Sequence, residues 1–450
     1  SMFAKETYMQ RRALLKKNLG SGVLLFLGND ECGLNYEDNT FRYRQDSTFL
    51  YYFGLSCAGL SAIIDIDEDK EIIFGDELSI DAIVWMGSQP TLREKCERVG
   101  VKDIMPSADI VGYLHKCVQP PYRPEHKLKL MDWLGIPPAR QEGSVPFIRA
   151  VIAQRNYKSA EEIVEIEKAC DVTADMHITA MKVLRPGMYE YEVVAEMNRV
   201  AQANNCELSF ATIATINGQT LHNHYHGNLV KPGDLFLIDA GAEIESGYAG
   251  DMSSTVPADK KFTTRQREVY EIQNAMHLES VKALRPGIPY MEVYELSARV
   301  MVEGMKTLGL MKGNAEDAVR EGAHALFYPH GLGHMMGLDV HDMENLGEIW
   351  VGYNGQPKST QFGRKSQRLA IPLEPGFVHT VEPGIYFIPE LIDMWKAEKK
   401  FADFINYEKV ETYKDFGGIR NEEDYLITET GARRLGKKIP LTPDEVEALR

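Results

Sequence analysis

Three histidines lie close together between His330 and Asp342, in the segment HGLGHMMGLDVHD. The first two, His330 and His334, are four residues apart, which is the spacing of the zinc-binding pair in the HExxH helix of metallopeptidases. The residues between them read GLG, so the glycines disfavour a helix and the glutamate that would act as general base is missing. The pattern instead predicts a glycine-rich strand or loop, and the spacing alone leaves open which histidine joins a metal.

Two aspartates are placed where they can meet a cation. Asp239 ends the apolar run LFLID, and Asp251 follows it by twelve residues after a glycine-rich stretch. Two carboxylates joined by a hairpin can converge on a hard ion such as Mg²⁺ or Mn²⁺. A single aspartate at the end of a strand is more often a turn or cap residue, so the pair alone is a weak signal.

Two Glu-Pro-Gly tripeptides begin at Glu374 and Glu382 and enclose FVHTV, which alternates like a strand. Glu374 precedes this strand and is predicted to lie in an exposed turn. Glu382 ends the strand, where its side chain can point into a cleft.

A further charged segment, GGIRNEEDYLI, supplies Arg420 and Glu422 ahead of an apolar run. Its next two residues, Glu423 and Asp424, are predicted to lie in a solvated acidic turn.

An internal repeat indicates which elements position these residues. MHITAMKVLRPGMYEYEV begins at Met176, and MHLESVKALRPGIPYMEV begins 100 residues later at Met276. In each copy a helix is predicted to end at Arg-Pro-Gly and a second helix to begin near Glu-Val. Strand runs at 234–244 and 376–387 favour two related halves, each with helices packed on an antiparallel or mixed sheet. A cleft between such halves is a natural place for chemistry.

The chain before this repeat has a different texture. The runs GVLLFLG (22–28), AIIDID with EIIFGDE, and AIVWMG (82–87) are predicted as strands of a small α/β domain. Ser159 and Glu162 then form a capping box at the start of a long amphipathic helix. We therefore place a small N-terminal α/β domain at 1–157 and a second domain at 158–450.

Composition excludes some partners. The 450 residues include 66 acidic and 50 basic ones, a formal charge of −16, which opposes nucleic-acid binding. The apolar run at Val23–Leu27 is far too short to span a bilayer, so no membrane partner is expected. Six cysteines without a CxxC pair predict reduced, buried thiols in a cytoplasmic protein. They are Cys32, Cys57, Cys96, Cys117, Cys170 and Cys206.

The quoted segments carry a family resemblance. LIDAGAE with GYAGD, HGLGHMMGLDVHD, TVEPGIY and GIRNEED resemble, in this order, the signature segments of the metallopeptidase family that contains Xaa-Pro aminopeptidase (aminopeptidase P) and prolidase. FRYRQDSTFLYYFGL (41–55) resembles their non-catalytic domain, which methionine aminopeptidases lack. The resemblance implies an α/β fold class: a small N-terminal α/β domain of the creatinase/aminopeptidase P type, and a pita-bread α+β catalytic domain with two pseudo-symmetric halves around a dinuclear centre.

The same resemblance implies a ligand set for two divalent metal ions, most simply Mn²⁺, with Co²⁺, Zn²⁺ and Mg²⁺ as alternatives. The implied ligands are Asp239, Asp251, His334, Glu382 and Glu422, with Asp251 and Glu422 bridging. Without cations, four carboxylates in one cleft would repel each other strongly, and two divalent ions neutralise them.

The resemblance also implies roles around the metals. Glu382 acts as general acid and base, and His330 and His341 donate hydrogen bonds to the substrate. A further substrate-side histidine is either His222 or His224, and both stay candidates.

Two more expectations concern the surroundings of the site. Arg420 is similar to an arginine that orients a ligand carboxylate, and Ser253 can hydrogen-bond there although the family's arginine after Asp251 is absent. The polar insertion at 343–370 is predicted to form a surface loop at the rim of the cleft, and His226 to lie in a surface loop.

The implied activity is removal of the first residue from peptides that begin Xaa-Pro, by a homodimer or higher homo-oligomer. The alternative is a prolidase that cleaves Xaa-Pro dipeptides. A metal-free, creatinase-like hydrolase or an inactive binding protein of the same fold is disfavoured because all five ligand residues are present.

Overall fold

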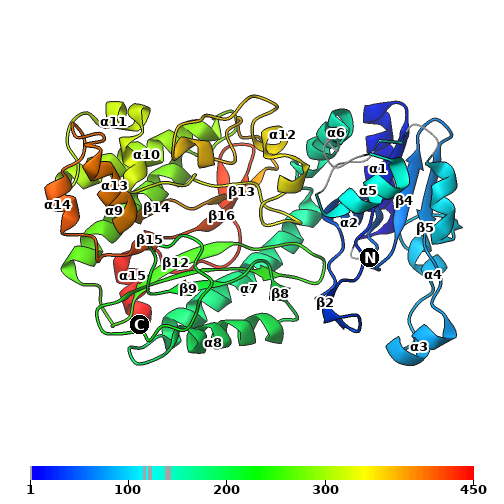
Figure 1. Cartoon of the computed structure of the whole chain (residues 1–450), viewed down its shortest axis with the longest axis horizontal. Helices are drawn as coiled ribbons and strands as arrows, with labels where there is room; N and C mark the ends of the chain where they lie inside the picture. The colour runs from blue at the N-terminus through cyan, green and yellow to red at the C-terminus, as the bar shows by residue number, and fades with distance from the viewer. Residues whose placement is uncertain (1–2, 115–117, 120–123, 137–142) are drawn as a thin grey trace. The chain divides into compact units, whose positions relative to one another are not determined.

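The computed structural model describes residues 3–114, 118–119, 124–136 and 143–450 (Figure 1). It divides into two compact units, Ser1–Arg155 with Met343–Trp350, and Asn156–Asp342 with Val351–Arg450. Within the described ranges, no helix has both the length and the apolar character that crossing a membrane requires.

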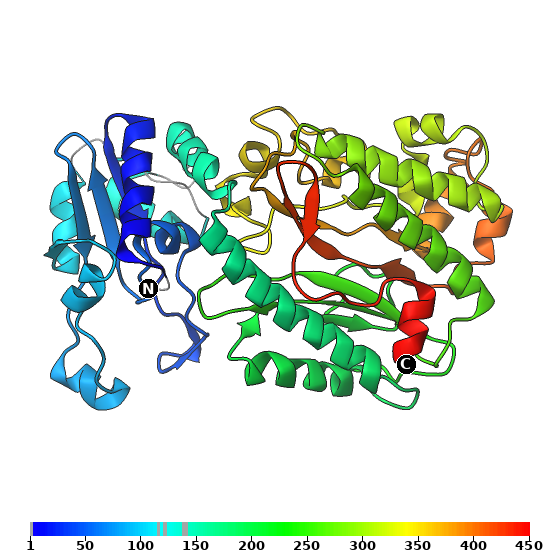
Figure 2. The same ribbon diagram turned by 180° about the vertical axis from the view of Figure 1, so that it is seen from behind.

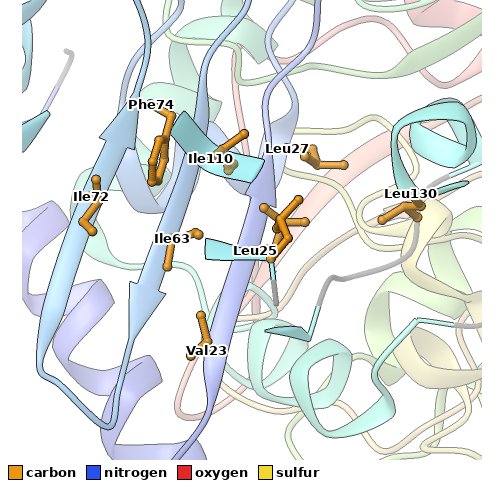
Figure 3. Close-up of a cluster of buried hydrophobic side chains, with 9 residues drawn as sticks. Val23, Leu25, Leu27, Ile63, Ile72, Phe74, Ile110 and Leu130 are labelled. Atoms are coloured by element: carbon orange, nitrogen blue, oxygen red, sulfur yellow. The ribbon is translucent and has the colours of Figure 1, made fainter. Parts of the chain in front are cut away.

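The first unit is built on a five-stranded sheet of order β6-β5-β4-β1-β7. The predicted hairpin is present: β4 and β5 pair antiparallel from Ser61↔Phe74 to Asp65↔Lys70. Apolar side chains on one face of this sheet pack with Ile110 and Leu130 (Figure 3). The elements of this unit are α1 (Lys5–Leu19), β1 (Val23–Leu27), β2 (Gly33–Tyr36), β3 (Asn39–Thr40), α2 (Ser47–Phe53), β4 (Ser61–Asp65), β5 (Lys70–Phe74), α3 (Ile80–Met86), α4 (Leu92–Glu97), β6 (Asp103–Met105), η1 (Ser107–Tyr113), β7 (Val118–Gln119), η2 (Pro124–His126), α5 (Lys127–Leu134), α6 (Val145–Arg155) and η5 (Glu344–Leu346).

The prediction of a strand at 82–87 is wrong, because this run forms helix α3. Ser79 caps the helix by accepting a hydrogen bond from the Ala82 backbone N–H, and the sheet position beside β5 is taken by β6. A short apolar run does not distinguish a strand from a helix by periodicity. Helix α3 buries none of its residues, and Trp85 is 86% exposed.

The prediction that the cysteines are free thiols agrees with the structure, whereas the prediction that all of them are buried does not. The five described cysteines are all free, and Cys96, Cys170 and Cys206 are buried as predicted. Cys32 is exposed and Cys57 is half-buried, which corrects the expectation for these two. Cys117 lies outside the described residues.

The second unit contains two helix pairs and several short sheets. Figure 2 shows α7 with α8, and α9 with α10, lying over the strands. The elements are α7 (Ala160–Val183), α8 (Glu190–Ala203), β8 (Glu207–Leu208), β9 (Ile213–Thr215), β10 (Leu235–Ala240), β11 (Ala242–Glu243), β12 (Met252–Pro257), α9 (Thr264–Ala283), α10 (Tyr290–Thr307), α11 (Ala315–Glu321), η4 (Ala323–Leu326), α12 (Glu348–Gly352), η6 (Arg364–Ser366), β13 (Val378–Val381), β14 (Gly384–Tyr386), α13 (Pro389–Ala397), α14 (Tyr407–Glu411), β15 (Gly418–Arg420), β16 (Glu423–Ile427), β17 (Ala432–Arg434) and α15 (Pro443–Leu449).

The sequence repeat corresponds to the two helix pairs. Helices α7 and α9 end just before the two Arg-Pro-Gly tripeptides, and α8 and α10 begin just after them. Gly187 and Gly287 have φ of 96° and 91°, values that L side chains rarely adopt. The predicted capping box of Ser159 and Glu162 is present at the start of α7. The repeat therefore describes a real duplication of the helix-turn-helix unit.

The two halves of this unit meet at a strand seam. The first half contributes the sheet β12-β10-β9 and the second contributes β13-β16-β17. An isolated antiparallel bridge pairs Ser253 with Glu422, and the Glu422 N–H donates to the Ser253 carbonyl at 2.9 Å. Thr255 Oγ1 also donates to the Arg420 carbonyl at 2.9 Å. The seam therefore brings residues from both halves together.

Arg12 offers a test of the first unit. Its fully buried guanidinium donates to the Tyr52 and Val99 carbonyls, each at 2.7 Å, and to Glu71. Arg12→Met leaves the buried carbonyl acceptors without a donor. We therefore expect the free energy of unfolding of the first unit, measured by urea denaturation, to fall by about 3 kcal/mol. Lys17→Met, an exposed change on the same helix, is the control and should stay within about 0.5 kcal/mol of wild type. Equal losses in both variants would contradict this account.

Candidate metal centre

A β-hairpin positions the two aspartates. Strands β10 and β12 pair antiparallel with Asp239 opposite Ser253, and Asp251 lies immediately before β12. The Asp251 side chain is 6% exposed, and its N–H donates to Asp424 Oδ2 at 3.2 Å. The predicted hairpin therefore exists and directs carboxylates from both of its strands to one region.

The HGLGH segment runs in extended form beside β13, as predicted, and is not a helix. The Thr380 N–H donates to the His334 carbonyl at 3.0 Å, and the Glu382 N–H donates to the Leu332 carbonyl at 2.8 Å. A Cβ atom on Gly333 would lie 2.1 Å from the Thr380 carbonyl oxygen. Glycine is therefore needed because the two backbones approach too closely for a side chain.

Glutamates follow strands from the second half. Glu382 comes directly after β13, and its Oε2 accepts a hydrogen bond from Thr380 Oγ1 at 2.9 Å. Glu422 precedes β16 and is fully buried, and its Oε1 accepts from Ser253 Oγ at 2.7 Å. The serine thus orients a carboxylate across the seam, although no arginine follows Asp251 in this chain.

The folded chain gathers these groups tightly. One ligand atom from each of Asp251, His334, Glu382 and Glu422 lies within 4.8 Å of the others. His334 Nε2 is 3.2 Å from Asp251 Oδ2 and 3.3 Å from Glu382 Oε2. Asp239 is not a member of this group of four, but it lines the cavity that lies beside the group.

Burial of so many carboxylates shifts their protonation. Burial raises the pKa of Asp251 to about 7. Burial and the charge of Asp251 raise the pKa of Glu422 well above its ordinary value. Burial also raises the pKa of Glu382, but hydrogen bonds to Glu422 and His334 outweigh it and hold this pKa well below the ordinary value.

His334 responds in the opposite sense. Burial lowers the pKa of His334, but hydrogen bonds to Asp251 and Glu382 outweigh it and raise this pKa well above the ordinary value. A protonated imidazole then serves as the counter-charge in the protein alone. A cation that replaces these protons must take over that neutralisation.

Three carboxylate oxygens indicate where positive charge fits. Asp239 Oδ1, Glu422 Oε2 and Asp424 Oδ1 are buried and accept no hydrogen bond from the described residues. An unpaired buried carboxylate oxygen is costly unless a metal or a donor satisfies it. Oxygen-rich donor sets with a single imidazole suit hard or borderline divalent ions, so the residues present fit a divalent metal.

A cavity of about 250 Å³ opens onto this group. His222, His330 and His341 line it, whereas His224 is not among the lining residues. His226 is half-buried, with its Nε2 2.9 Å from the Thr212 carbonyl. Of the two candidates on this loop, His222 is the one the fold brings to the cavity.

The prediction of a surface loop at 343–370 is wrong in both halves, because the first half contains η5 and helix α12 and the second half is partly buried. Gln367 and Leu369 are buried, and Gln367 Oε1 accepts a hydrogen bond from the Leu332 N–H at 2.6 Å. Ser366 and Arg368 line the cavity. The segment is therefore part of the wall of the site, which its polar composition concealed.

Arg420 connects Asp239 to His330 through a residue that the sequence analysis missed, Tyr386. Arg420 donates to Asp239 Oδ2 at 3.0 Å and to the Tyr386 hydroxyl at 2.7 Å. Burial raises the pKa of Tyr386 to about 12, so the hydroxyl keeps its proton and donates to His330 Nε2 at 2.7 Å. His330 Nδ1 then carries the proton that it donates to the Gly331 carbonyl, at 2.7 Å. Both ring nitrogens of His330 are thus occupied within the protein.

His330 is also electrically neutral. Burial and the nearby Arg420 charge lower the pKa of His330 to about 4. Its hydrogen bonds fix one tautomer and one ring orientation beside the cavity.

The prediction of a solvated turn at Glu423 and Asp424 is wrong, because both residues lie in β16 and are buried. Glu423 Oε1 is 2.8 Å from His277 Nε2, and Asp424 accepts from the Asp251 backbone. Alternate residues of a strand share a face, so Glu422 and Asp424 both point toward Asp251. That alternation was the signal that could have identified Asp424.

The chain has two domains. The first is a small α/β unit, and the second is a duplicated unit that gathers acidic residues and a histidine beside a cavity. This combination is typical of a metal-dependent enzyme. A model of the metallopeptidase family M24 matches residues 164–429, and a model of the aminopeptidase P N-terminal domain matches residues 8–123. The chain belongs to metallopeptidase family M24 and is a peptidase of that family. The predicted family and fold class are therefore confirmed.

Individual relatives cover nearly the whole chain. It is 31% identical to Xaa-Pro aminopeptidase of Escherichia coli, covering 100% of this chain and 98% of the relative. It is 29% identical to Xaa-Pro dipeptidase of Rattus norvegicus, covering 96% and 90%. A glutamate-to-alanine variant of Escherichia coli aminopeptidase P in complex with substrate superposes with a TM-score of 0.82 at 30% identity, covering 100% of this chain and 98% of that structure.

The protonation pattern predicts that metal uptake releases protons. Below about pH 7 the protein alone holds protons on Asp251, whose pKa is raised to about 7, as well as on Glu422 and His334. We expect the affinity for Mn²⁺ to rise with pH, by about tenfold per pH unit for each proton displaced, and to flatten at higher pH. Titration calorimetry in buffers of different ionisation enthalpy measures both quantities. Glu374→Ala is the control and should behave as wild type; an affinity independent of pH would contradict the assignment.

Proposed function

We propose that this protein is a dinuclear-metal exopeptidase that hydrolyses the Xaa-Pro bond at the N-terminus of peptides. The observation that carries the proposal is the close grouping of Asp251, His334, Glu382 and Glu422, of which His334 and Glu382 line a cavity that further histidines also line. The named activities of the relatives, Xaa-Pro aminopeptidase and Xaa-Pro dipeptidase, support the choice of bond.

The proposal assigns the five carboxylate and histidine groups to two cations. Asp239, Asp251, His334, Glu382 and Glu422 would hold them, with Asp251 and Glu422 shared between the two. Manganese suits this set because oxygens outnumber the single nitrogen, and Co²⁺, Zn²⁺ and Mg²⁺ are the alternatives. Two divalent cations supply Lewis acidity, which polarises a peptide carbonyl and makes water a nucleophile near neutral pH.

Glu382 is the residue best placed to move a proton. Its side chain is 21% exposed at the cavity, against 6% for Asp251, and its lowered pKa keeps it ionised at neutral pH. In the proposed reaction Glu382 takes a proton from the attacking water and delivers it to the proline nitrogen as the bond breaks.

The histidines of the cavity wall bind the substrate. His222 and His341 would donate hydrogen bonds to the carbonyl of the residue before proline, and losing one such donor typically costs about 10²- to 10³-fold in rate. His330 would act with them by exchanging its bond to Tyr386 or Gly331 for one to the substrate. Arg420 holds Asp239 in place and excludes other conformations of its carboxylate.

A second candidate function is that of a dipeptidase acting on Xaa-Pro. The observation that favours it is Arg368, which joins Arg420 in the cavity wall. A guanidinium there suits the free carboxylate of a dipeptide. A metal-free hydrolase or an inactive binding protein is opposed by the complete set of acidic residues.

The proposal extends to assembly and compartment. Helix α3 exposes Ile80, Val84 and Trp85 at 80%, 73% and 86%, which supports a homodimer or higher homo-oligomer that covers them. The free thiols of the described cysteines support a reducing compartment, the cytoplasm. The net charge of −16 opposes nucleic acid as a partner.

The activity is tested with manganese-loaded protein on Ala-Pro-Ala and Ala-Pro. We expect wild type to release alanine faster from the tripeptide; preference for Ala-Pro would select the dipeptidase instead. His334→Ala and Glu382→Ala should reduce turnover to background because each removes a ligand. Glu374→Ala is the matched control, because this glutamate begins the other Glu-Pro-Gly tripeptide and is exposed ahead of β13. It should keep near-wild-type turnover. Substantial turnover by either ligand variant would refute the metal assignment.

The assembly is tested at helix α3. Trp85→Ser should lower the molar mass measured by light scattering after gel filtration, because it removes an apolar side chain from the proposed contact. Val111→Ser, which changes another apolar residue at 59% exposure, is the control and should leave the mass unchanged. A monomeric wild type would reject the oligomer.

A further inference from the structure

A buried ion pair lies behind the cavity wall. Lys158 Nζ is 2.9 Å from Asp342 Oδ2, and each side chain is only 1% exposed. Desolvation of two charges offsets most of their attraction, so a buried ion pair is a weak stabilising device compared with apolar packing. The main effect of such a pair is to fix the geometry of the two segments that carry its charges.

The pair closes the turn that carries His341. The Asp342 N–H donates to the Met335 carbonyl at 3.0 Å, and Asp342 Oδ1 accepts from the Asp339 N–H at 3.3 Å. One carboxylate oxygen is thus used inside the turn, and the other reaches Lys158. His341 precedes Asp342 directly, lines the cavity, and has its ring centroid 4.1 Å from that of His334.

Lys158 is itself held at a defined place. Its N–H donates to the Gly376 carbonyl at 2.9 Å, and the next residue, Ser159, is the N-cap of the long helix α7. A Cβ atom on Gly337 would lie 2.9 Å from both Asp342 Oδ2 and Lys158 Cε. The pair is therefore packed against the backbone of the turn, with no space for an alternative arrangement.

Strand β13 holds the backbone of the neighbouring proposed metal ligand, His334. The His334 N–H donates to Thr380 Oγ1 at 3.2 Å, and the His334 carbonyl accepts from the Thr380 N–H. Strand β13 thus holds His334, while the turn and the ion pair hold His341. The two sets of contacts meet at the Met335 carbonyl, which accepts from the Asp342 N–H and lies 2.9 Å from His334 Nδ1.

We propose that Lys158, acting through Asp342, is a positioning residue that orients His341 toward the substrate. This role rests on the proposed peptidase function. A displacement of about 1 Å at a substrate-binding group can cost about 10²-fold in rate, so a pair that prevents such movement affects turnover without touching substrate or metal.

The test uses the double variant Lys158→Met with Asp342→Asn, which removes both charges while the introduced amide keeps an oxygen for the turn. The single variant Lys158→Met would leave an uncompensated buried carboxylate and can unfold the chain. We expect kcat on Ala-Pro-Ala to fall about 10- to 100-fold, while KM and Mn²⁺ affinity stay within about threefold. Lys437→Met, which breaks an exposed pair with Asp175, is the control and should change none of these quantities.

Two further measurements separate positioning from general damage. In a His341→Ala background the double variant should cost no further kcat, whereas in a His222→Ala background it should cost as much as in wild type. Independently of turnover, diethylpyrocarbonate should modify His341 severalfold faster in the double variant, with His222 unchanged, as read by mass spectrometry of the peptides. Wild-type turnover in the same series tests the peptidase function by itself. Multiplicative losses with His341→Ala, or an unchanged modification rate of His341, would overturn the proposal.

Discussion

The structure of the second unit depends on one electrostatic constraint: several carboxylates are buried beside a single cavity. Asp251 and Glu422 are buried and lie close to Glu382, so their mutual repulsion must be cancelled where it arises. In the protein alone, protons and the imidazolium of His334 cancel it. The orphaned oxygens of Asp239 and Glu422 show that these substitutes are incomplete, and the donor types fit a divalent metal. The rest of the unit is built to hold this arrangement in place.

Two sets of contacts hold the site together against the repulsion between its carboxylates. The seam between the halves pairs Ser253 with Glu422 through both backbone and side chain. The close approach of the HGLGH segment to β13, which Gly333 permits, fixes His334. Hydrogen bonds from Arg420 to Asp239 and from the Asp251 N–H to Asp424 then restrict the orientations of these two carboxylates. Backbone contacts therefore fix the positions of the site residues, and side-chain hydrogen bonds fix the orientations of the carboxylates.

Much of this was visible in the sequence, and the reason is local. The Arg-Pro-Gly repeat, the Ser159 capping box and the Asp239–Asp251 hairpin each follow from residues close together in the chain, and all three are present. The failures concern burial. The run at 82–87 forms an exposed helix, and Glu423 and Asp424 are buried in a strand although acidic residues usually face solvent. Tyr386 and Arg368 were missed because their roles depend on segments far apart in sequence. Strand alternation would have recovered Asp424, but no local signal identifies Arg368.

The seam between the halves also has a consequence for how the chain folds. The residues that gather at the cavity come from segments beginning at Asp239 and ending at Glu422, so the complete group forms only when both duplicated halves have formed and docked. Contacts of such long sequence separation form late, because loop-closure entropy opposes them until local structure is in place. The complete candidate metal site is thus a product of the docking of the two halves. A cation that needs the complete set of ligands would therefore bind only the docked state and would stabilise that state over partly docked ones.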